Sequence, residues 1–157
     1  AHKGHLKISK VAIKKYKIKK IIWAITKKNP FKNKSVNDYK KRIKFAKKII
    51  GKNKSITIKC FEEKVKSNKA INLINYIAKK NKNTKLFFLM GADNLINLHK
   101  WKKYERIIKL CKILVFDRNG FKAKALRSRS YKKYKKKYIE FIKFDKVNIS
   151  SSQIRNI

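Results

Sequence analysis

The chain is poor in acidic residues, glycine, proline and cysteine. Only 8 of its 157 residues are Asp or Glu, against 47 Lys or Arg, so the formal net charge is +39 at pH 7. Four Gly and one Pro exclude collagen-like and linker-like chains. No apolar run approaches the roughly 20 residues that span a bilayer, and lysines interrupt every apolar stretch near the start, where a signal peptide would need one. We therefore expect a soluble, cytoplasmic protein with no membrane partner.

The remaining composition is typical of a folded domain. Hydrophobic residues make up 43% of the chain and aromatic residues 11%, which argues against a disordered basic tail. The length is that of one domain, and a chain of this size can bury a sizeable core. We expect a single domain over residues 1–157.

The positive charge has two explanations. Basic side chains neutralise phosphates, so a basic nucleic-acid-binding domain is one candidate function. However, 94 of the 157 residues are Lys, Ile, Asn, Phe or Tyr, whose codons consist mostly of A and U. Lys also outnumbers Arg by 41 to 6, although Arg is the better bidentate phosphate ligand. Compositional drift is the favoured explanation, and no specific nucleic-acid partner is expected.

The two cysteines, Cys60 and Cys111, lie far apart, each in an apolar segment. This spacing favours a reducing compartment and two buried thiols over a disulfide framework or a zinc site.

Apolar periodicity predicts strands that alternate with helices. The expected strands are 21–26, 55–61, 85–90, 112–116 and 138–144, and the expected helices are 5–16, 36–50, 68–80 and 104–110, with a short helical stretch before Trp101. Residues 118–137 are read as a loop with one exposed basic helix. This pattern indicates an α/β fold with a mostly parallel sheet. Such sheets bind ligands beyond the carboxyl ends of their strands, which directs attention to the segments that follow each strand.

The string His2-Lys3-Gly4-His5 stands at the start of the first expected helix. Helix N-termini attract anions through free backbone N–H groups and the helix dipole. Gly4 would let a phosphate approach the backbone, and the two histidines, three residues apart, can face one oxyanion. The string alone is a weak signal.

Two further segments follow strands. In Ser150-Ser151-Ser152-Gln153-Ile154-Arg155, a serine would cap a helix and Arg155 would bind a phosphate from one turn further on. Gly91-Ala92-Asp93 follows the strand 85–90; its glycine permits a tight turn or a close ligand, and Asp93 is a candidate cap for the next helix. Each segment is also compatible with an ordinary surface helix.

Taken in order, these motifs resemble those of bacterial nicotinate-nucleotide adenylyltransferase. HKGH at the start, LMGADNLxxxHxW in the middle and ISSSQIR at the end are similar to that family's (T/H)xGH, GAD…W and ISSTxIR motifs. The loops Asn29-Pro30-Phe31-Lys32 and Asp117-Arg118-Asn119-Gly120 also resemble their counterparts. The resemblance covers essentially the whole chain and implies a Rossmann-like nucleotidyltransferase fold.

The resemblance also implies a reaction and a set of site residues. ATP and nicotinate mononucleotide would give deamido-NAD and pyrophosphate, with Mg²⁺ carried by the ATP phosphates and no metal site of the protein's own. His2 and His5 would be catalytic. The residues implied in ATP binding are His2, Gly4, His5, Gly91, Asp93, Ser150, Ser151 and Arg155. Asn29, Lys32 and Trp101 would bind the second substrate, with Trp101 near the nicotinate ring.

The chain departs from the family pattern at several points. The family has a strand and a Gly-rich turn before its first motif, so the chain as printed is expected to lack its N-terminal strand and to be poorly soluble or inactive in that form. A Thr-rich segment that helps to recognise the nicotinate carboxylate is replaced by Lys69-Ala70-Ile71-Asn72, and Lys102 replaces an aromatic residue. Lys69 and Lys102 are the candidates to favour the carboxylate instead. A sister adenylyltransferase for another mononucleotide or phosphopantetheine remains an alternative.

Overall fold

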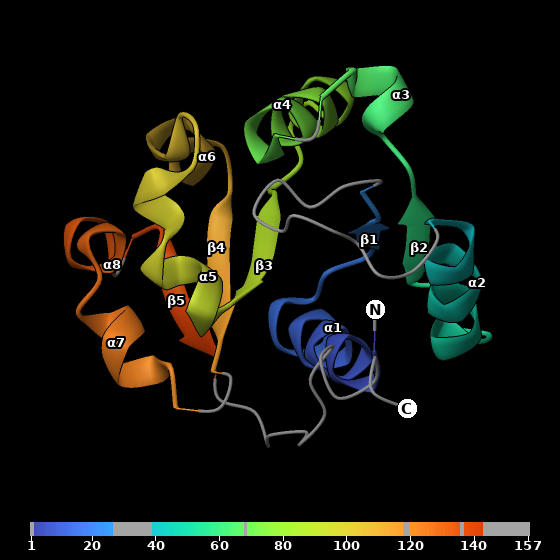
Figure 1. Ribbon diagram of the computed structural model, residues 1–157, viewed down its shortest axis with the longest axis horizontal. Helices are drawn as coiled ribbons and strands as arrows, with labels where there is room; N and C mark the ends of the chain where they lie inside the picture. The colour runs from blue at the N-terminus through green and yellow to red at the C-terminus, as the bar shows by residue number, and fades with distance from the viewer. Residues whose placement is uncertain (1, 27–38, 68, 118–119, 136, 143–157) are drawn as a thin grey trace. The chain divides into compact units, whose positions relative to one another are not determined.

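The computed structural model describes residues 2–26, 39–67, 69–117, 120–135 and 137–142. These residues group into two compact units, the first within residues 1–68 and the second within residues 69–146. The elements of each unit are coloured along the chain in Figure 1. No helix among the described residues is both long enough and apolar enough to cross a membrane.

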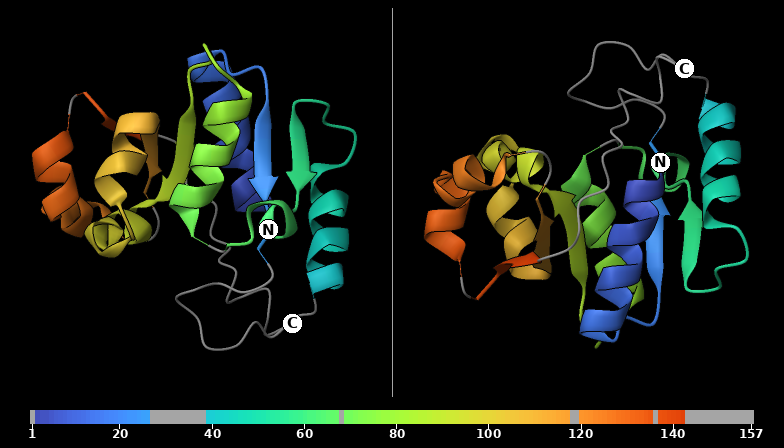
Figure 2. Two further views of the ribbon diagram at one scale, coloured as in Figure 1. Left: turned by 90° about the horizontal axis from the view of Figure 1, so that it is seen from above. Right: turned by 90° about the horizontal axis from the view of Figure 1, so that it is seen from below.

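The first unit pairs two parallel strands with helices. Its elements are α1 (Lys3–Tyr16), β1 (Ile21–Ala24), α2 (Tyr39–Ile50), β2 (Ile56–Lys59) and the short α3 (Glu62–Val65). Strands β1 and β2 run parallel, with Trp23 opposite Ile58. Figure 2 shows α2 running alongside β2 in both views. Small, branched and aromatic side chains fill the interior: Ala12, Ile21, Ala46, Ile56 and Phe61.

The second unit contains a three-stranded parallel sheet in the order β3-β4-β5. Its strands are β3 (Phe87–Gly91), β4 (Lys112–Phe116) and β5 (Ile139–Ile142). Its helices are α4 (Ala70–Lys80), α5 (Ala92–Ile96), the 3₁₀ turn η1 (Leu98–Lys100), α6 (Tyr104–Leu110), α7 (Lys122–Leu126) and α8 (Arg129–Tyr134). Parallel strands flanked by helices confirm the predicted α/β fold.

The central strand β4 is buried because both of its edges are paired and helices cover it. Ile113, Leu114, Val115 and Phe116 are each 0% exposed. Ile113 and Val115 pack with Leu95 and Leu98 of the α5–η1 segment in one apolar cluster. This packing matches the apolar run KILVF, from which the strand was predicted with the same bounds.

Residues 118–137 differ from the prediction of a loop with one exposed helix. The described part contains two helices, α7 and α8, and α8 is half-buried because Tyr131 and Tyr134 pack against the core of the second unit. Lys133 Nζ and Tyr134 Oη lie 2.8 and 3.0 Å from Glu105 Oε1, which joins α8 to α6. The pKa of the Glu105 carboxyl is lowered, mainly by the hydrogen bond from Lys133.

The prediction of two buried thiols is half wrong. Cys111 is buried, but Cys60 is exposed because it follows the last residue of β2, where the chain leaves the sheet. Both cysteines are free thiols, as predicted.

A thiol reagent is therefore expected to modify Cys60 and to spare Cys111 in the folded protein. Burial raises the pKa of Cys111 to about 12, and its Sγ donates to the carbonyl oxygen of Ile107 at 3.1 Å. The thiolate is the reactive form, so Cys111 lacks both reactivity and access. Mass spectrometry after brief iodoacetamide treatment should find one modified cysteine in the native protein and two after denaturation. Equal modification rates of the two native thiols would contradict this assignment.

Candidate active site

The N-terminus of α1 is closed by a capping box in which histidines take both roles. His2 is the N-cap, and its Nδ1 accepts a hydrogen bond from the Gly4 backbone N–H at 3.1 Å. In return, the backbone N–H of His2 donates to Nδ1 of His5 at 3.3 Å. The arrangement is that of a Ser/Thr-x-x-Glu/Gln capping box, in which each side chain satisfies a backbone donor of the first turn. Local hydrogen bonding therefore holds the HxGH string in place.

This hydrogen-bond pattern assigns the tautomer of both rings. A neutral imidazole carries one donor nitrogen and one acceptor nitrogen. Because Nδ1 is the acceptor in His2 and in His5, each neutral ring carries its proton on Nε2. Two Nε2–H donors thus accompany the N-terminus of a 14-residue helix whose first turn has no acidic residue. This combination is suited to binding an anion such as a phosphate.

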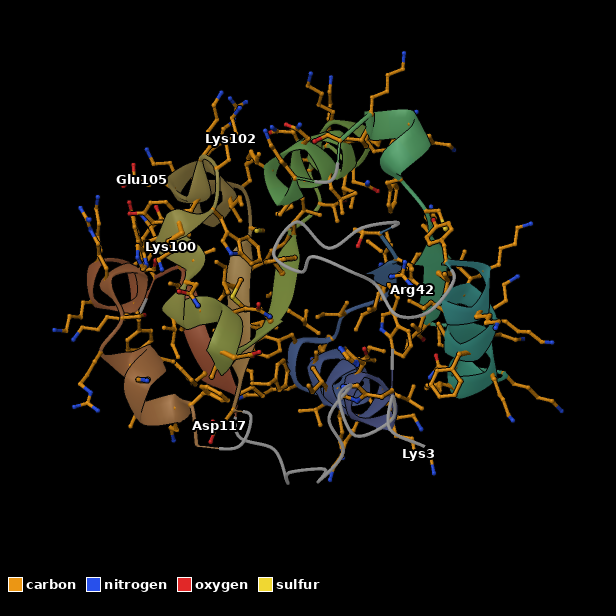
Figure 3. All side chains as sticks on the ribbon, viewed as in Figure 1. Lys3, Arg42, Lys100, Lys102, Glu105 and Asp117 are labelled. Atoms are coloured by element: carbon orange, nitrogen blue, oxygen red, sulfur yellow. The ribbon has the colours of Figure 1, made fainter. Side chains whose placement is uncertain are left out.

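The two rings lie against each other and beside an indole. The centroids of the His2 and His5 rings are 4.0 Å apart, and the His5 ring is 6.2 Å from that of Trp23 on β1. His2 is only 4% exposed and His5 is half-buried. Lys3, between them in the sequence, is exposed on the first turn and is labelled in Figure 3. The motif therefore presents two buried or half-buried imidazoles and one exposed cation.

The Gly-Ala-Asp segment lies where β3 passes directly into α5. Gly91 is the last residue of β3 and the N-cap of α5, and Asp93 is half-buried in the first turn of that helix. Gly91 has φ −76° and ψ 156°, a conformation open to any residue, so the backbone angle does not require glycine here. The other predicted reason for a glycine at this position, that a ligand lies close to the backbone, stays a prediction.

Trp101 connects the core of the second unit with the start of α4. It is half-buried, and its ring meets that of Phe88 edge-on at 6.1 Å. It also packs against the cluster that contains Ile71, in the first turn of α4. The neighbouring Lys102 is exposed, and Figure 3 shows it on the outer side of this region. Trp101 is therefore both a core aromatic and a partly accessible ring.

The predicted site residues fall into three groups. His2, Gly4 and His5 come together at the start of α1 in the first unit. Gly91, Asp93 and Trp101 belong to the second unit. Five others lie outside the described residues: Asn29, Lys32, Ser150, Ser151 and Arg155. The part of the chain that the structure describes holds no group of three His, Cys, Asp or Glu side chains able to bind a metal ion.

One residue beside this site, Trp23 on β1, lies outside the sequence motifs. It is half-buried, and its Nε1 donates to Ser9 Oγ on α1 at 3.0 Å. Ser9 follows His5 by four residues and so lies on the same helix face, but this spacing alone does not indicate a contact with Trp23.

Comparisons with known proteins agree with the motif order. The model of the family described as cytidylyltransferase-like matches residues 1–157. A probable nicotinate-nucleotide adenylyltransferase of Pelagibacter ubique is 62% identical over 157 residues, covering 100% of this chain and 87% of that protein. One of Clostridium novyi is 30% identical over 160 residues, covering 99% of this chain and 80% of that protein.

Solved structures show the same fold. The nicotinic acid mononucleotide adenylyltransferase of Plasmodium falciparum, complexed with NaAD, matches with a TM-score of 0.76 at 19% identity and covers 98% of this chain and 76% of that chain. The same protein complexed with APC matches with a TM-score of 0.74 at 18% identity, covering 98% and 75% of the two chains.

Proposed function

The chain belongs to the cytidylyltransferase-like family, and we propose that it is the nicotinate-nucleotide adenylyltransferase that makes deamido-NAD in NAD biosynthesis. The 62% identical relative, which covers the whole chain, supports this substrate pair. The observation that carries the chemistry is the pair of Nε2–H donors that the capping box sets at the N-terminus of α1.

The reaction transfers an adenylyl group without a covalent enzyme intermediate. A phosphate oxygen of nicotinate mononucleotide attacks the α-phosphorus of ATP in line. The new P–O bond forms while the bond from the α-phosphorus to the bridging α–β oxygen breaks, and pyrophosphate leaves. Negative charge grows on the leaving pyrophosphate, so the protein acts by positioning the substrates and by stabilising that charge.

The histidines of α1 supply donors for that charge. In this proposal, Nε2–H of His2 and of His5 donate to triphosphate oxygens, while Gly4 allows close approach of the phosphates to the helix start. Donors fixed before the reaction need no reorganisation when charge develops, which is why such groups have large effects on rate. Both Nδ1 atoms accept hydrogen bonds within the cap, so we assign the contact with the triphosphate to Nε2 of each ring.

The remaining predicted residues receive separate roles. Gly91 and Asp93 line the nucleotide pocket. Asn29 and Lys32 bind the second substrate. The residues proposed to hold phosphates at the last predicted helix are Ser150, Ser151 and Arg155.

Mg²⁺ is expected to arrive with ATP. This ion prefers oxygen ligands, keeps several of its waters and commonly binds through substrate phosphates. When bound there, it neutralises part of the triphosphate charge. We assign it no dedicated protein site, and the enzyme is proposed to work in the cytoplasm, where two free cysteines are expected to stay reduced.

The nicotinate ring is proposed to lie on the accessible part of Trp101. Lys69 is the N-cap of α4, whose first turn packs in the same cluster as Trp101, and the exposed Lys102 follows the tryptophan directly. Either cation would favour a substrate that carries a carboxylate over the uncharged amide. This placement would make the enzyme prefer nicotinate mononucleotide to nicotinamide mononucleotide.

A substrate panel tests the proposal. Pyrophosphate release from ATP is measured with nicotinate mononucleotide, nicotinamide mononucleotide and phosphopantetheine in parallel. We expect the fastest release with nicotinate mononucleotide. Faster release with phosphopantetheine or another mononucleotide would favour a sister adenylyltransferase. No release with any of them, together with salt-sensitive RNA binding that survives loss of His5, would favour a nucleic-acid-binding domain.

Replacing Trp101 by alanine is expected to raise the KM for nicotinate mononucleotide about 5- to 100-fold, the range expected for losing one base–aromatic stacking contact. The KM for ATP should change much less. Trp101→Phe is the matched control, because a phenyl ring keeps both the stacking face and much of the packing against Phe88. An alanine variant that keeps its fold and its KM for the mononucleotide would remove Trp101 from the substrate site.

A further inference from the structure

The indole of Trp23 contacts α1 at two places. Its Nε1 donates to Ser9 Oγ at 3.0 Å, and its ring lies 6.2 Å from the His5 ring at an interplanar angle of 68°. Ser9 is 2% exposed, so this hydrogen bond is shielded from water. The pairing of Trp23 with Ile58 of β2 fixes the backbone from which the indole projects. One side chain from β1 therefore reaches both a buried hydroxyl and a predicted catalytic imidazole.

The geometry of α1 explains why one indole reaches both residues. Ser9 follows His5 by four positions, and residues four apart on a helix lie on the same face, separated by about 6 Å along the axis. A tryptophan side chain is long enough to cover that distance. The Ser9 hydroxyl holds one end of the indole while the ring borders His5.

The hydrogen bond that His5 makes within the capping box is long, so a neighbouring ring adds to the restraint on the imidazole. Nδ1 of His5 accepts from the His2 backbone N–H at 3.3 Å, which is long for a protein hydrogen bond. Rotation about the bond to the imidazole ring is only loosely restricted by intrinsic torsional preference. The rings of His2 and Trp23 pack against the imidazole and restrict this rotation.

We propose that Trp23, held by its hydrogen bond to Ser9, is a positioning residue that fixes the His5 imidazole in the orientation needed to present Nε2–H. This inference rests on the proposed function, in which that donor contacts the phosphates of ATP. Trp23 itself touches no substrate in this account. A small misplacement of a catalytic group can cost about 10²-fold in rate, so a restraint on His5 has a measurable effect.

Two mild variants break the restraint without removing His5. Ser9→Ala removes the acceptor, and Trp23→Phe removes the donor but keeps an aromatic ring. Each is expected to lower kcat about 3- to 10-fold, the size of one ordinary hydrogen bond, and to change the KM of either substrate less than about 2-fold. The double variant should be no slower than the slower single variant, because both changes break the same contact. Ser130→Ala is the matched control.

Ser130→Ala is a suitable control because, like Ser9→Ala, it removes the hydroxyl of a buried serine, but in the second unit rather than in that of His5. It is 0% exposed, and its Oγ has no hydrogen-bond partner among the described residues. Ser130→Ala should leave kcat unchanged.

A second background separates positioning from a general loss of structure. In a His5→Ala protein, Ser9→Ala and Trp23→Phe should cause no further loss of turnover, because the group that they position is absent. If Ser9 and Trp23 had a merely structural role, the two substitutions would lower kcat by the same factor with and without His5. That result would overturn the proposal.

Nitrogen NMR of the imidazoles gives a readout that does not depend on activity. The chain has three histidines, so the spectrum is simple to assign. In the unmodified protein His5 should show a single Nε2-protonated form, and in both variants its signals should broaden or shift. Normal kcat and an unchanged His5 spectrum in active variants would overturn the positioning role and leave the proposed function standing. If the full-length protein without substitutions transfers no adenylyl group, the proposed function fails, and an unchanged spectrum in the variants still overturns the restraint.

Discussion

Replacing His5 by alanine is expected to lower the kcat of adenylyl transfer by about 10²- to 10³-fold, the usual cost of losing one preorganised donor to a developing charge. The KM for ATP should rise much less, because the Nε2–H of His5 contributes most where charge accumulates in the transition state. Steady-state pyrophosphate release over a range of ATP concentrations separates the two effects.

His5→Ala also removes one half of the capping box, so a control must separate the cap from the donor. His5→Glu keeps an acceptor for the backbone N–H of His2, since glutamate is a natural partner at this position of a capping box. It has no donor for a phosphate. We expect the glutamate variant to unfold at the same temperature as the unmodified protein and to lose at least as much turnover as the alanine variant.

Glutamine at the same position tests whether an N–H donor can replace the Nε2–H of His5. Its side chain offers both an oxygen for the cap and an N–H donor. His5→Gln is therefore expected to keep more activity than His5→Ala or His5→Glu. Near-normal turnover in the glutamate variant would show that His5 acts only as a helix cap.

Replacing Ile113 by alanine is expected to destabilise the protein by about 2–5 kcal/mol, the range for truncating a fully buried branched side chain. Ile113 is 0% exposed in the central strand β4, where it pairs with Phe88 of β3 and Ile139 of β5. The loss combines the transfer free energy of the missing methyl groups with the cavity that they leave. Urea unfolding monitored by circular dichroism measures the change in the free energy of unfolding.

Ile113→Val provides the graded control. It removes one methylene group and should cost about 0.5–1.5 kcal/mol, clearly less than the alanine variant. Phe45→Ala, at a side chain that is 41% exposed, should change the free energy of unfolding by less than about 0.5 kcal/mol. If Ile113→Ala were as stable as Phe45→Ala, this result would contradict the burial of β4 in the core of the second unit.

The sequence predicted strand and helix positions best where burial is uniform. Strand β4 and helix α6 have the predicted bounds, Lys112–Phe116 and Tyr104–Leu110, because an unbroken apolar run and a regular apolar spacing leave little choice of register. Helices α7 and α8 were not resolved by the same reasoning. They have five and six residues, too few for a periodicity that needs a window of about 11–18 residues.

The start of α1 shows why helix boundaries are harder. The prediction began this helix at His5, but it begins at Lys3 because His2 caps it. Ser, Thr, Asp and Asn are the usual caps, and nothing in general propensities marks a histidine as one. The exposure of Cys60 has a similar cause, since alternation in 55–61 does not reveal that the strand ends at Lys59.

Motif order indicated the family more clearly than single residues did. His2, Gly4 and His5 were each weak signals, and the structure shows that hydrogen bonds join them into one unit. The Trp23–Ser9 contact could not be predicted, because it depends on how β1 packs against α1, which local sequence does not encode. The +39 charge contributed least, since lysines occur in every part of the chain.

The most direct test of the account follows the α-phosphorus of ATP. The full-length protein is incubated with Mg²⁺, nicotinate mononucleotide and ATP labelled at the α-phosphate, and the products are measured by mass spectrometry. We expect deamido-NAD that carries the label and unlabelled pyrophosphate in equal amounts. Hydrolysis of ATP to ADP and phosphate, or no labelled dinucleotide at all, would contradict it.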